Sequence, residues 1–240
     1  GLLGRNINYS FSKGYFTEKF ENEKLVGYTY ENFDIPNIES FLAVIKNNDY
    51  LSGMNVTIPY KEEVIPFLDK LSKKAIKIGA VNTIRFTKKG KLKGYNTDYY
   101  GFQKSLEPLL ESHHKKALIL GTGGASKGVA FALEELGIEY AFVSRQASET
   151  VLGYNQITDL IFDEYQIVIN STPVGTSPNT EAYPEIPYEF FTKKHIAYDL
   201  IYNPAETQFL KKAQHQGATT KNGMDMLIFQ AEKAWKIWNK

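Results

Sequence analysis

The sequence predicts an α/β fold with two α/β domains. Between residues 25 and 83, segments with the apolar spacing of helices alternate with segments rich in aromatic and β-branched residues. A second strand–helix series begins near residue 115, where a glycine-rich loop follows an apolar strand. Such alternation is typical of mostly parallel sheets with helices on their faces. A length of 240 residues leaves room for two domains of this kind.

Each segment of the first series is predicted from its residue types. Aromatic and β-branched residues predict strands at 25–33 and 51–58, and apolar residues at every third or fourth position predict helices at 35–48 and 60–71. Two more strands are expected around a Lys-Lys-Gly turn, followed by a helix at about 99–110.

The second series predicts a Rossmann-like domain. After the glycine-rich loop we expect a helix, then strands at 139–145, 166–172 and 195–201. A last helix at 224–240 carries apolar residues over much of its circumference, so we expect it to be well covered.

Composition excludes several functional classes. The chain has no cysteine, which excludes disulfides, thiolate metal sites and a cysteine nucleophile, and its four histidines lack metal-ligand spacing. With 28 basic and 27 acidic residues the formal net charge is +1, which gives no argument for a nucleic-acid partner. No apolar run approaches the roughly 20 residues of a membrane helix. We therefore expect a cytoplasmic protein without a nucleic-acid, membrane or metal partner.

The loop in "ALILGTGGAS" predicts a dinucleotide site. An apolar strand leads into Gly121, Gly123 and Gly124, and a helix follows. Glycines there allow a tight turn and let the backbone approach a pyrophosphate, whose charge is stabilised by the amides at a helix start. Ser126 stands where a third glycine is usual, so the inference depends on the order of strand, loop and helix. The alternative is a glycine turn that binds no ligand.

The end of the next strand indicates which dinucleotide is bound. An NAD site usually has an acidic residue at this position, which contacts the ribose hydroxyls, but this chain has Ser144 and Arg145. Arginine makes forked, charge-assisted contacts with phosphate, so the pair favours the 2′-phosphate of NADP. The alternative for Arg145 is a solvated cation.

A nicotinamide enzyme also needs an acid/base for the proton on the substrate oxygen. Lys61, in "NVTIPYKEEV", is the natural candidate. Asn55 and Thr57 alternate along the strand before it, so both should face one side at the ligand-binding end. Asn82 lies in an apolar context and Asp98 at a helix start. The alternatives are a solvated lysine, a local turn at Asn82 and an N-cap at Asp98.

Together these motifs resemble the shikimate dehydrogenase family over nearly the whole chain. Eight blocks carry the resemblance and stand in the family's order: "SFS" at 10–12, "NVTIPYKEE", "GAVNT", "NTD", "GTGGAS", "NSTPVG", "YDLIYNP" and "GMDMLIFQA". One block could arise by chance, whereas eight in order could not.

The resemblance implies reversible, NADPH-dependent reduction of 3-dehydroshikimate to shikimate in chorismate and aromatic amino acid biosynthesis. It implies Lys61 and Asp98 as the catalytic pair. The implied substrate-binding residues are Ser10, Ser12, Asn55, Thr57, Asn82, Tyr202 and Gln230. The implied cofactor-binding residues are Gly121, Gly123, Gly124, Ala125, Ser126, Ser144, Arg145, Asn170, Ser171, Thr172 and Gly223.

The resemblance also implies a domain plan. Residues 1–97 with 222–240 would bind substrate and carry catalysis, 98–221 would bind NADP, and the last helix would return to the first domain. The active site is expected in the cleft between the domains, in a monomer or a homodimer. Two rivals stay open: a quinate/shikimate dehydrogenase that uses NAD, and a non-catalytic sensor of a shikimate-like ligand.

The sequence departs from the family pattern in three places. Lys13 and Gly14 follow the second serine where proline is usual. Arg145 lacks a second cation shortly after it, so the NADP preference is expected to be softer than is usual in the family. Asn222 replaces an aspartate before the last helix, which keeps an oxygen acceptor and drops the charge.

Overall fold

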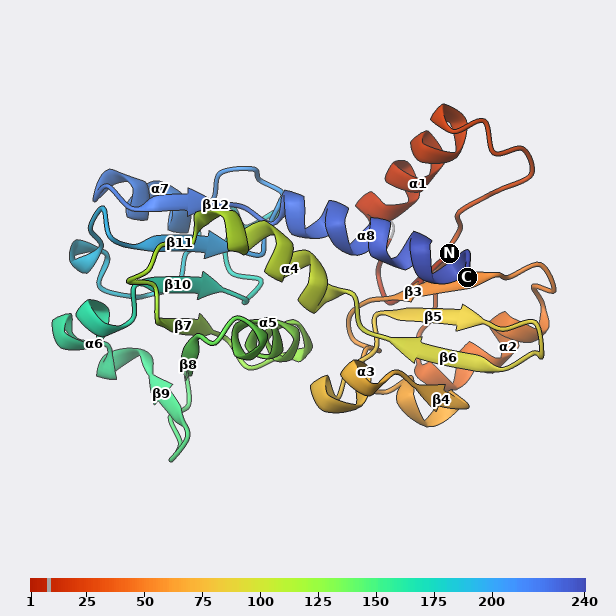
Figure 1. Cartoon of the computed structure of the whole chain (residues 1–240), viewed down its shortest axis with the longest axis horizontal. Coiled ribbons are helices and arrows are strands. Elements are labelled where there is room, and N and C mark those ends of the chain that lie inside the picture. The colour runs from red at the N-terminus through yellow and green to blue at the C-terminus, as the bar shows by residue number, and fades with distance from the viewer. Residues whose placement is uncertain (8–9) are drawn as a thin grey trace. The chain divides into compact units, whose positions relative to one another are not determined.

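The computed structural model describes residues 1–7 and 10–240, which form two compact α/β units. The first unit comprises Gly1–Thr97 and Ala231–Lys240, and the second comprises Asp98–Gln230. Each unit is built around its own six-stranded sheet (Figure 1). The predicted fold class is therefore confirmed.

The sheet of the first unit is mixed. Its order is β2 (Asn32–Asp34), β1 (Leu2–Gly4), β3 (Gly53–Val56), β5 (Thr83–Phe86), β6 (Leu92–Tyr95) and β4 (Lys70–Leu71). β1 is parallel to β2 and β3, and β4 is parallel to β6, whereas β5 is antiparallel to both of its neighbours. The α-helices among 1–97 are α1 (Phe11–Asn22), α2 (Phe41–Lys46) and α3 (Lys73–Ile78).

Both faces of this sheet are covered, and β1 shows how. Successive side chains of a strand point to opposite faces. Leu2 packs in a cluster with Phe16 and Phe20 of α1, against which Trp235 and Trp238 also pack. The next residue, Leu3, belongs to a separate cluster with residues of η1 (Ile38–Ser40), α2 and β3.

The segment 60–71 is not the helix that its apolar spacing predicts. It forms turns, one 3-10 turn, η2 (Ile65–Phe67), and then β4. Pro66 lies in the middle of the segment, and proline lacks the amide hydrogen of a helix and clashes with the preceding turn. The helix prediction was therefore wrong. The strand expected at 25–33 is also shorter, since β2 begins only at Asn32.

The sheet of the second unit is parallel throughout. Its order is β12 (Thr219–Lys221), β11 (Ile196–Asp199), β10 (Ile167–Asn170), β7 (Lys116–Leu120), β8 (Glu139–Ser144) and β9 (Val151–Gly153). This is the doubly wound order in which the direction of strand addition reverses between β7 and β10. Ligands bind such sheets at the carboxyl ends of the strands beside the reversal.

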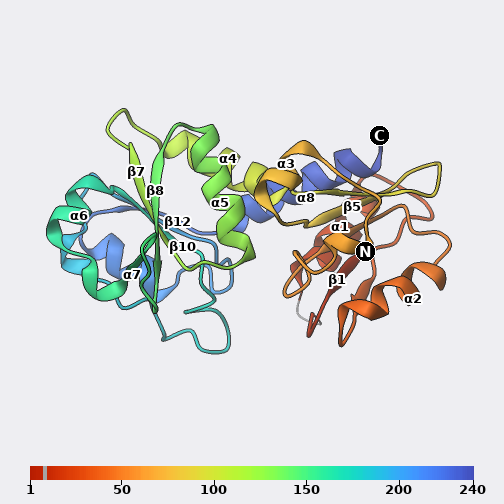
Figure 2. The same ribbon diagram turned by 90° about the horizontal axis from the view of Figure 1, so that it is seen from below.

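Helices lie on both faces of this second sheet (Figure 2). They are α4 (Asp98–Leu106), α5 (Gly124–Glu135), α6 (Asp159–Glu164) and α7 (Gln208–His215), with short 3-10 turns at η3 (Glu107–Leu109), η4 (Tyr154–Gln156) and η5 (Tyr188–Phe190). Leu118 and Leu120 pack in one core cluster with Phe162 of α6 and Phe209 of α7. The central strands are buried on both faces, which explains their continuous apolar runs.

The last helix, α8 (Met224–Trp238), contributes to both units. Up to Gln230 its residues group with the second unit, and from Ala231 with the first. In the first unit, Trp238 Nε1 donates a hydrogen bond of 3.0 Å to the carbonyl of Ile84. The predicted return of this helix is confirmed, while the functional boundary at residue 222 stays a prediction. Among the described residues, no helix has the length and apolar character needed to cross a membrane.

We predict that Gly101→Ala destabilises the second unit. A methyl group at Gly101 would overlap the carbonyl oxygen of Met226 and lie 3.0 Å from Cβ of Gln230, so α4 and α8 could not keep their close packing. Overpacking of this kind costs about 1–3 kcal/mol. Thermal unfolding of the purified variant measures the loss.

Gly14→Ala is the control, because Gly14 lies in α1 and the space that an alanine Cβ would occupy there is open. Alanine there should be neutral or stabilise by up to about 1 kcal/mol through helix propensity. Equal unfolding temperatures for Gly101→Ala and Gly14→Ala would contradict the packing argument.

Candidate active site

In the first unit, the carboxamide of Asn55 is held by three hydrogen bonds. Its Oδ1 accepts from the Tyr30 hydroxyl at 2.8 Å. Its Nδ2 donates to the carbonyl of Asn82 at 3.2 Å and to Thr83 Oγ1 at 3.3 Å. The side chain lies on β3 opposite Thr83 of β5 and is buried. Burial of a carboxamide is tolerated because its polar atoms are paired.

Asn82 connects the start of β5 to the segment that precedes α4. Its Oδ1 accepts from the amide of Thr97 at 2.6 Å and from Thr83 Oγ1 at 3.1 Å, and its Nδ2 donates to Thr97 Oγ1 at 3.0 Å. Asn82, Thr83 and Thr97 are all buried. The structure therefore fixes Thr97, and Asp98 is the next residue of the chain.

The backbone of Lys61 is anchored close to the hydrogen-bonded cluster formed by Asn55, Asn82, Thr83 and Thr97. Lys61 follows Tyr60, which is buried and donates its hydroxyl to the carbonyl of Ile35 at 2.7 Å. The carbonyl of Lys61 accepts from the amide of Val81 at 2.7 Å. Because Val81 directly precedes Asn82, the half-buried Lys61 is held beside the segment that carries the Asn82 carboxamide.

The two predicted serines lie at the start of α1. Ser10 is the N-cap, and its hydroxyl accepts from the amide of Ser12 at 3.2 Å. Ser12 follows in the first turn of α1. Thr57 lies just beyond β3, with its methyl group close to Gly4, and it takes no part in these hydrogen bonds. The structure thus brings together Asn55 and Asn82.

In the second unit, the glycine loop lies where the strand order reverses, between β7 and β10. Gly121 follows β7 with φ +102, in the left-handed region that glycine adopts without strain. A Cβ there would lie 3.0 Å from Thr172 Cγ2 and 3.1 Å from Ser171 Oγ, just after β10. The Ser171 hydroxyl donates to the carbonyl of Leu120 at 2.6 Å. The loop after β7 and the segment after β10 therefore lie in contact.

The start of α5 fits a pyrophosphate. Gly123 is the N-cap, and Gly124 and Ala125 follow in the first turn, where backbone amides lack intrahelical acceptors. Ser126 is buried, and its hydroxyl donates to the carbonyl of Gly123 at 2.6 Å. Serine can replace the usual third glycine here because its one polar group bonds back to the loop.

Ser144 and Arg145 lie at the end of the neighbouring strand. β8 ends at Ser144, and Arg145 is exposed directly after it. The amide of Gly121 donates to the carbonyl of Val143 at 2.8 Å, so the glycine loop and the Arg145 backbone lie at the same edge of the sheet. An exposed arginine at this place fits a phosphate on the ribose.

Asn170 supports the segment after β10. Its Nδ2 donates to Asp199 Oδ1 at 3.1 Å and to the carbonyl of Val174 at 3.3 Å, and its Oδ1 accepts from Thr172 Oγ1 at 2.6 Å. Asp199 also accepts from Thr207 Oγ1 at 2.6 Å. Burial raises the pKa of Asp199 to about 6, against the opposing effect of these hydrogen bonds. Asp199 ends an apolar strand, and no periodic pattern in the sequence singles it out.

Tyr202 and Gly223 come together after β11. The amide of Gly223 donates to the carbonyl of Ile201, which precedes Tyr202, at 3.0 Å. Gly223 packs so tightly on the backbone of Leu200 that no side chain would fit. Asn222 Oδ1 accepts from the amide of Met224 at 3.2 Å, so the expected acceptor is retained.

Gln230 lies on α8 within the second unit. It is buried, and its Nε2 donates to the carbonyl of Leu227 at 3.0 Å. Its Cβ and amide lie close to the Cα of Gly101 on α4. Lys61 belongs to the first unit, whereas Asp98 is the first residue of the second.

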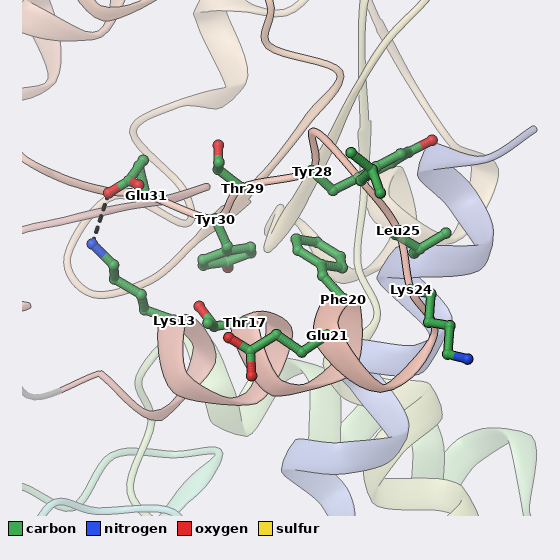
Figure 3. Close-up of a pocket in the computed structure, with 11 residues that line it drawn as sticks. Lys13, Thr17, Phe20, Glu21, Lys24, Leu25, Tyr28, Thr29, Tyr30 and Glu31 are labelled. Atoms are coloured by element: carbon green, nitrogen blue, oxygen red, sulfur yellow. Dashed lines mark hydrogen bonds and ion pairs between the residues drawn. The ribbon is translucent and has the colours of Figure 1, made fainter.

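A pocket of about 400 Å³ lies between α1 and residues 24–31 and contains none of the predicted site residues (Figure 3). Lys13 and Glu31 form an ion pair of 2.7 Å at its wall. Tyr30 also lines this pocket, while its hydroxyl reaches Asn55. Tyr30, Thr83 and Thr97 belong to the same hydrogen-bonded cluster as Asn55 and Asn82, but the sequence did not predict them as site residues.

Comparison with known proteins identifies the family. The sequence model described as "Shikimate dehydrogenase substrate binding domain" matches residues 2–84. A shikimate dehydrogenase (NADP(+)) of Methanosphaera stadtmanae is 37% identical, over 99% of this chain and 90% of its own length. The chain belongs to the shikimate dehydrogenase family. The family predicted from the eight sequence blocks is thus confirmed.

Solved structures of two shikimate dehydrogenases and of a quinate dehydrogenase are similar to this chain over nearly its whole length. One in complex with NADP+ is 35% identical with a TM-score of 0.88, covering 99% of this chain and 88% of that one. The Thermus thermophilus enzyme in complex with NADP(H) and shikimate is 32% identical with a TM-score of 0.87, covering 99% and 91%. A quinate dehydrogenase of Corynebacterium glutamicum in complex with NAD is 26% identical with a TM-score of 0.87, covering 99% and 92%.

We predict that Asp199 makes the second unit less stable as the pH rises from about 4 to about 6. Its pKa is raised from 3.8 to about 6, so the folded state holds the proton more tightly than the unfolded state. Linkage then lowers the free energy of unfolding through this window, by up to about 3 kcal/mol at neutral pH. Urea unfolding of wild type and Asp199→Asn at several pH values measures the difference.

Asp159→Asn is the matched control, since Asp159 is an exposed acid in the first turn of α6. Its unfolding free energy should run parallel to that of wild type across the same pH range. The prediction fails if the Asp199→Asn curve also stays parallel to wild type.

Proposed function

We propose that the protein is an NADP-dependent shikimate dehydrogenase that reversibly reduces 3-dehydroshikimate to shikimate. Family membership over 99% of the chain is the observation that carries the proposal. The predicted oxidoreductase activity and NADP cofactor agree with the names of the relatives. The cytoplasmic location and the monomeric or homodimeric state remain predictions.

The second unit fits the dinucleotide. The left-handed Gly121 and the first-turn amides of α5 offer a close backbone approach for the pyrophosphate. Arg145 and Ser144 would contact the 2′-phosphate. When bound, NADPH supplies the hydride. The further residues proposed toward the cofactor are Gly123, Gly124, Ala125, Ser126, Asn170, Ser171, Thr172 and Gly223.

Shikimate carries a carboxylate and three hydroxyls, and the proposed substrate residues match those groups. Ser10 and Ser12 would meet the carboxylate. Amide and hydroxyl side chains would meet the ring hydroxyls, namely Asn55, Thr57, Asn82, Tyr202 and Gln230. An analogue that lacks one hydroxyl should bind poorly, because buried polar groups would lose their partner.

Lys61 and Asp98 are proposed as the acid/base pair. Reduction of a ketone needs a proton at the oxygen while hydride reaches the carbon, and positioned acid/base groups typically contribute about 10²- to 10⁴-fold in rate. The anchored backbone of Lys61 and the fixed Thr97 before Asp98 support these roles. The proposed functional domains are residues 1–97 with 222–240 for substrate and catalysis, and 98–221 for the cofactor.

The decisive test is shikimate-dependent reduction of NADP by the purified protein. Comparison of kcat/KM for shikimate and quinate, each with NADP and NAD, separates the proposal from its rivals. A preference for quinate with NAD favours the quinate enzyme. Binding of shikimate without any turnover favours a sensor.

We predict that Lys61→Ala lowers kcat for shikimate by about 10²- to 10⁴-fold, because the proton at the reacting oxygen loses its acid/base. Affinity for NADP should stay unchanged, as measured by fluorescence titration. Lys77→Ala, an exposed lysine of α3, is the control and should keep full activity. Unchanged turnover in Lys61→Ala would remove this lysine from the mechanism.

We predict that Arg145→Ala raises the Kd for NADP by about 10- to 100-fold, the worth of charge-assisted hydrogen bonds, with little change for NAD. Arg145→Lys keeps the charge but loses the forked geometry of the guanidinium, so its Kd for NADP should lie between those of wild type and Arg145→Ala. Titration of both cofactors measures the effect. An equal loss for NADP and NAD would contradict the phosphate contact.

A further inference from the structure

We infer that Tyr30 is a positioning residue for substrate recognition, acting through Asn55. This inference rests on the proposed function of Asn55. Tyr30 lies outside every motif of the sequence, between α1 and β2. Its hydroxyl nevertheless donates a hydrogen bond of 2.8 Å to Asn55 of β3. A residue outside the motifs therefore holds a residue of the proposed substrate site.

Tyr30 is held rigidly enough for this role. Its side chain is 3% exposed, and its ring stacks on Phe16 with centroids 4.6 Å apart and an interplanar angle of 11°. Trp238 packs at a tilt with a centroid distance of 6.4 Å. Figure 3 shows the ring of Tyr30 in the pocket wall beside Phe20. The aromatic packing fixes the ring, and the ring fixes where the hydroxyl lies.

One backbone carbonyl decides which group donates and which accepts in the hydrogen bonds of Asn55 and Tyr30. The carbonyl of Asn82 can only accept, so the amide nitrogen of Asn55 must face it. Asn55 Oδ1 then faces Tyr30, whose single hydroxyl proton is donated to it. Burial raises the pKa of Tyr30, so its hydroxyl keeps the proton and stays a donor.

This order decides what Asn55 can offer a ligand. Both of its amide hydrogens are donated within the protein, to Asn82 and Thr83. Its Oδ1 accepts from Tyr30 and has a second lone pair. Asn55 therefore presents an acceptor, which suits a ligand hydroxyl that donates. Without the Tyr30 hydroxyl, the buried oxygen loses its partner, and the carboxamide is held only through its nitrogen.

Tyr30→Phe tests the inference, because it removes the hydroxyl and keeps the stacked ring. We expect the KM for shikimate to rise about tenfold, with kcat and the KM for NADP within twofold of wild type. A merely structural role would lower thermal stability without changing the KM for shikimate, or would change all kinetic constants together. Tyr28→Phe is the matched control, since Tyr28 is half-exposed on the same segment and packs on Phe20. It should leave all constants unchanged.

A double-mutant cycle with Asn55→Ala tests whether the Tyr30 hydroxyl affects the KM for shikimate through Asn55. If Tyr30 acts mainly through Asn55, adding Tyr30→Phe to Asn55→Ala should raise the KM for shikimate less than threefold further. A full tenfold effect in both backgrounds would overturn the inference. So would an unchanged KM in Tyr30→Phe beside an active wild type. A wild-type protein that does not oxidise shikimate overturns the proposed function itself, and the inference with it.

Discussion

The first unit depends on one constraint, which is that the carboxamide of a buried asparagine must have hydrogen-bond partners. Asn82 meets it through Thr97 and Thr83, and its backbone carbonyl accepts from both the amide of Val56 and the side chain of Asn55. Together these bonds tie the ends of β3, β5 and β6 to one another. Breaking one of them would leave a polar group unpaired in the core, which opposes any other arrangement of these loops.

In the second unit, too, the side-chain hydrogen bonds of a buried asparagine hold the loop segments. Asn170, at the end of a central strand, bonds to Asp199 on the next strand and to Thr172 in the segment that follows. Polar residues at the ends of buried strands thus shape the loops around the glycine turn. In both units an asparagine that looks like a ligand-binding residue also organises the backbone, so loss of activity on its substitution does not by itself show ligand contact.

The sequence predicts the second unit better than the first. A glycine turn between strand and helix is a local signal, and the parallel sheet follows from it, whereas Pro66 overrides the apolar period of 60–71. The hydrogen-bonded cluster of the first unit was foreseen only in part. Asn55 and Asn82 stand out as polar residues in apolar strands, but the bond from Tyr30 to Asn55 spans 25 positions and has no periodic signature. The roles assigned to individual site residues stay predictions.

The aromatic cluster of the first unit has a practical consequence. The chain has two tryptophans, Trp235 and Trp238, and both pack in that cluster beside Phe16 and Phe20. Intrinsic tryptophan fluorescence is therefore a reporter of the first unit alone, while circular dichroism senses the helices of both. Following the two signals through one denaturation would show whether the units melt together or in sequence, without any label.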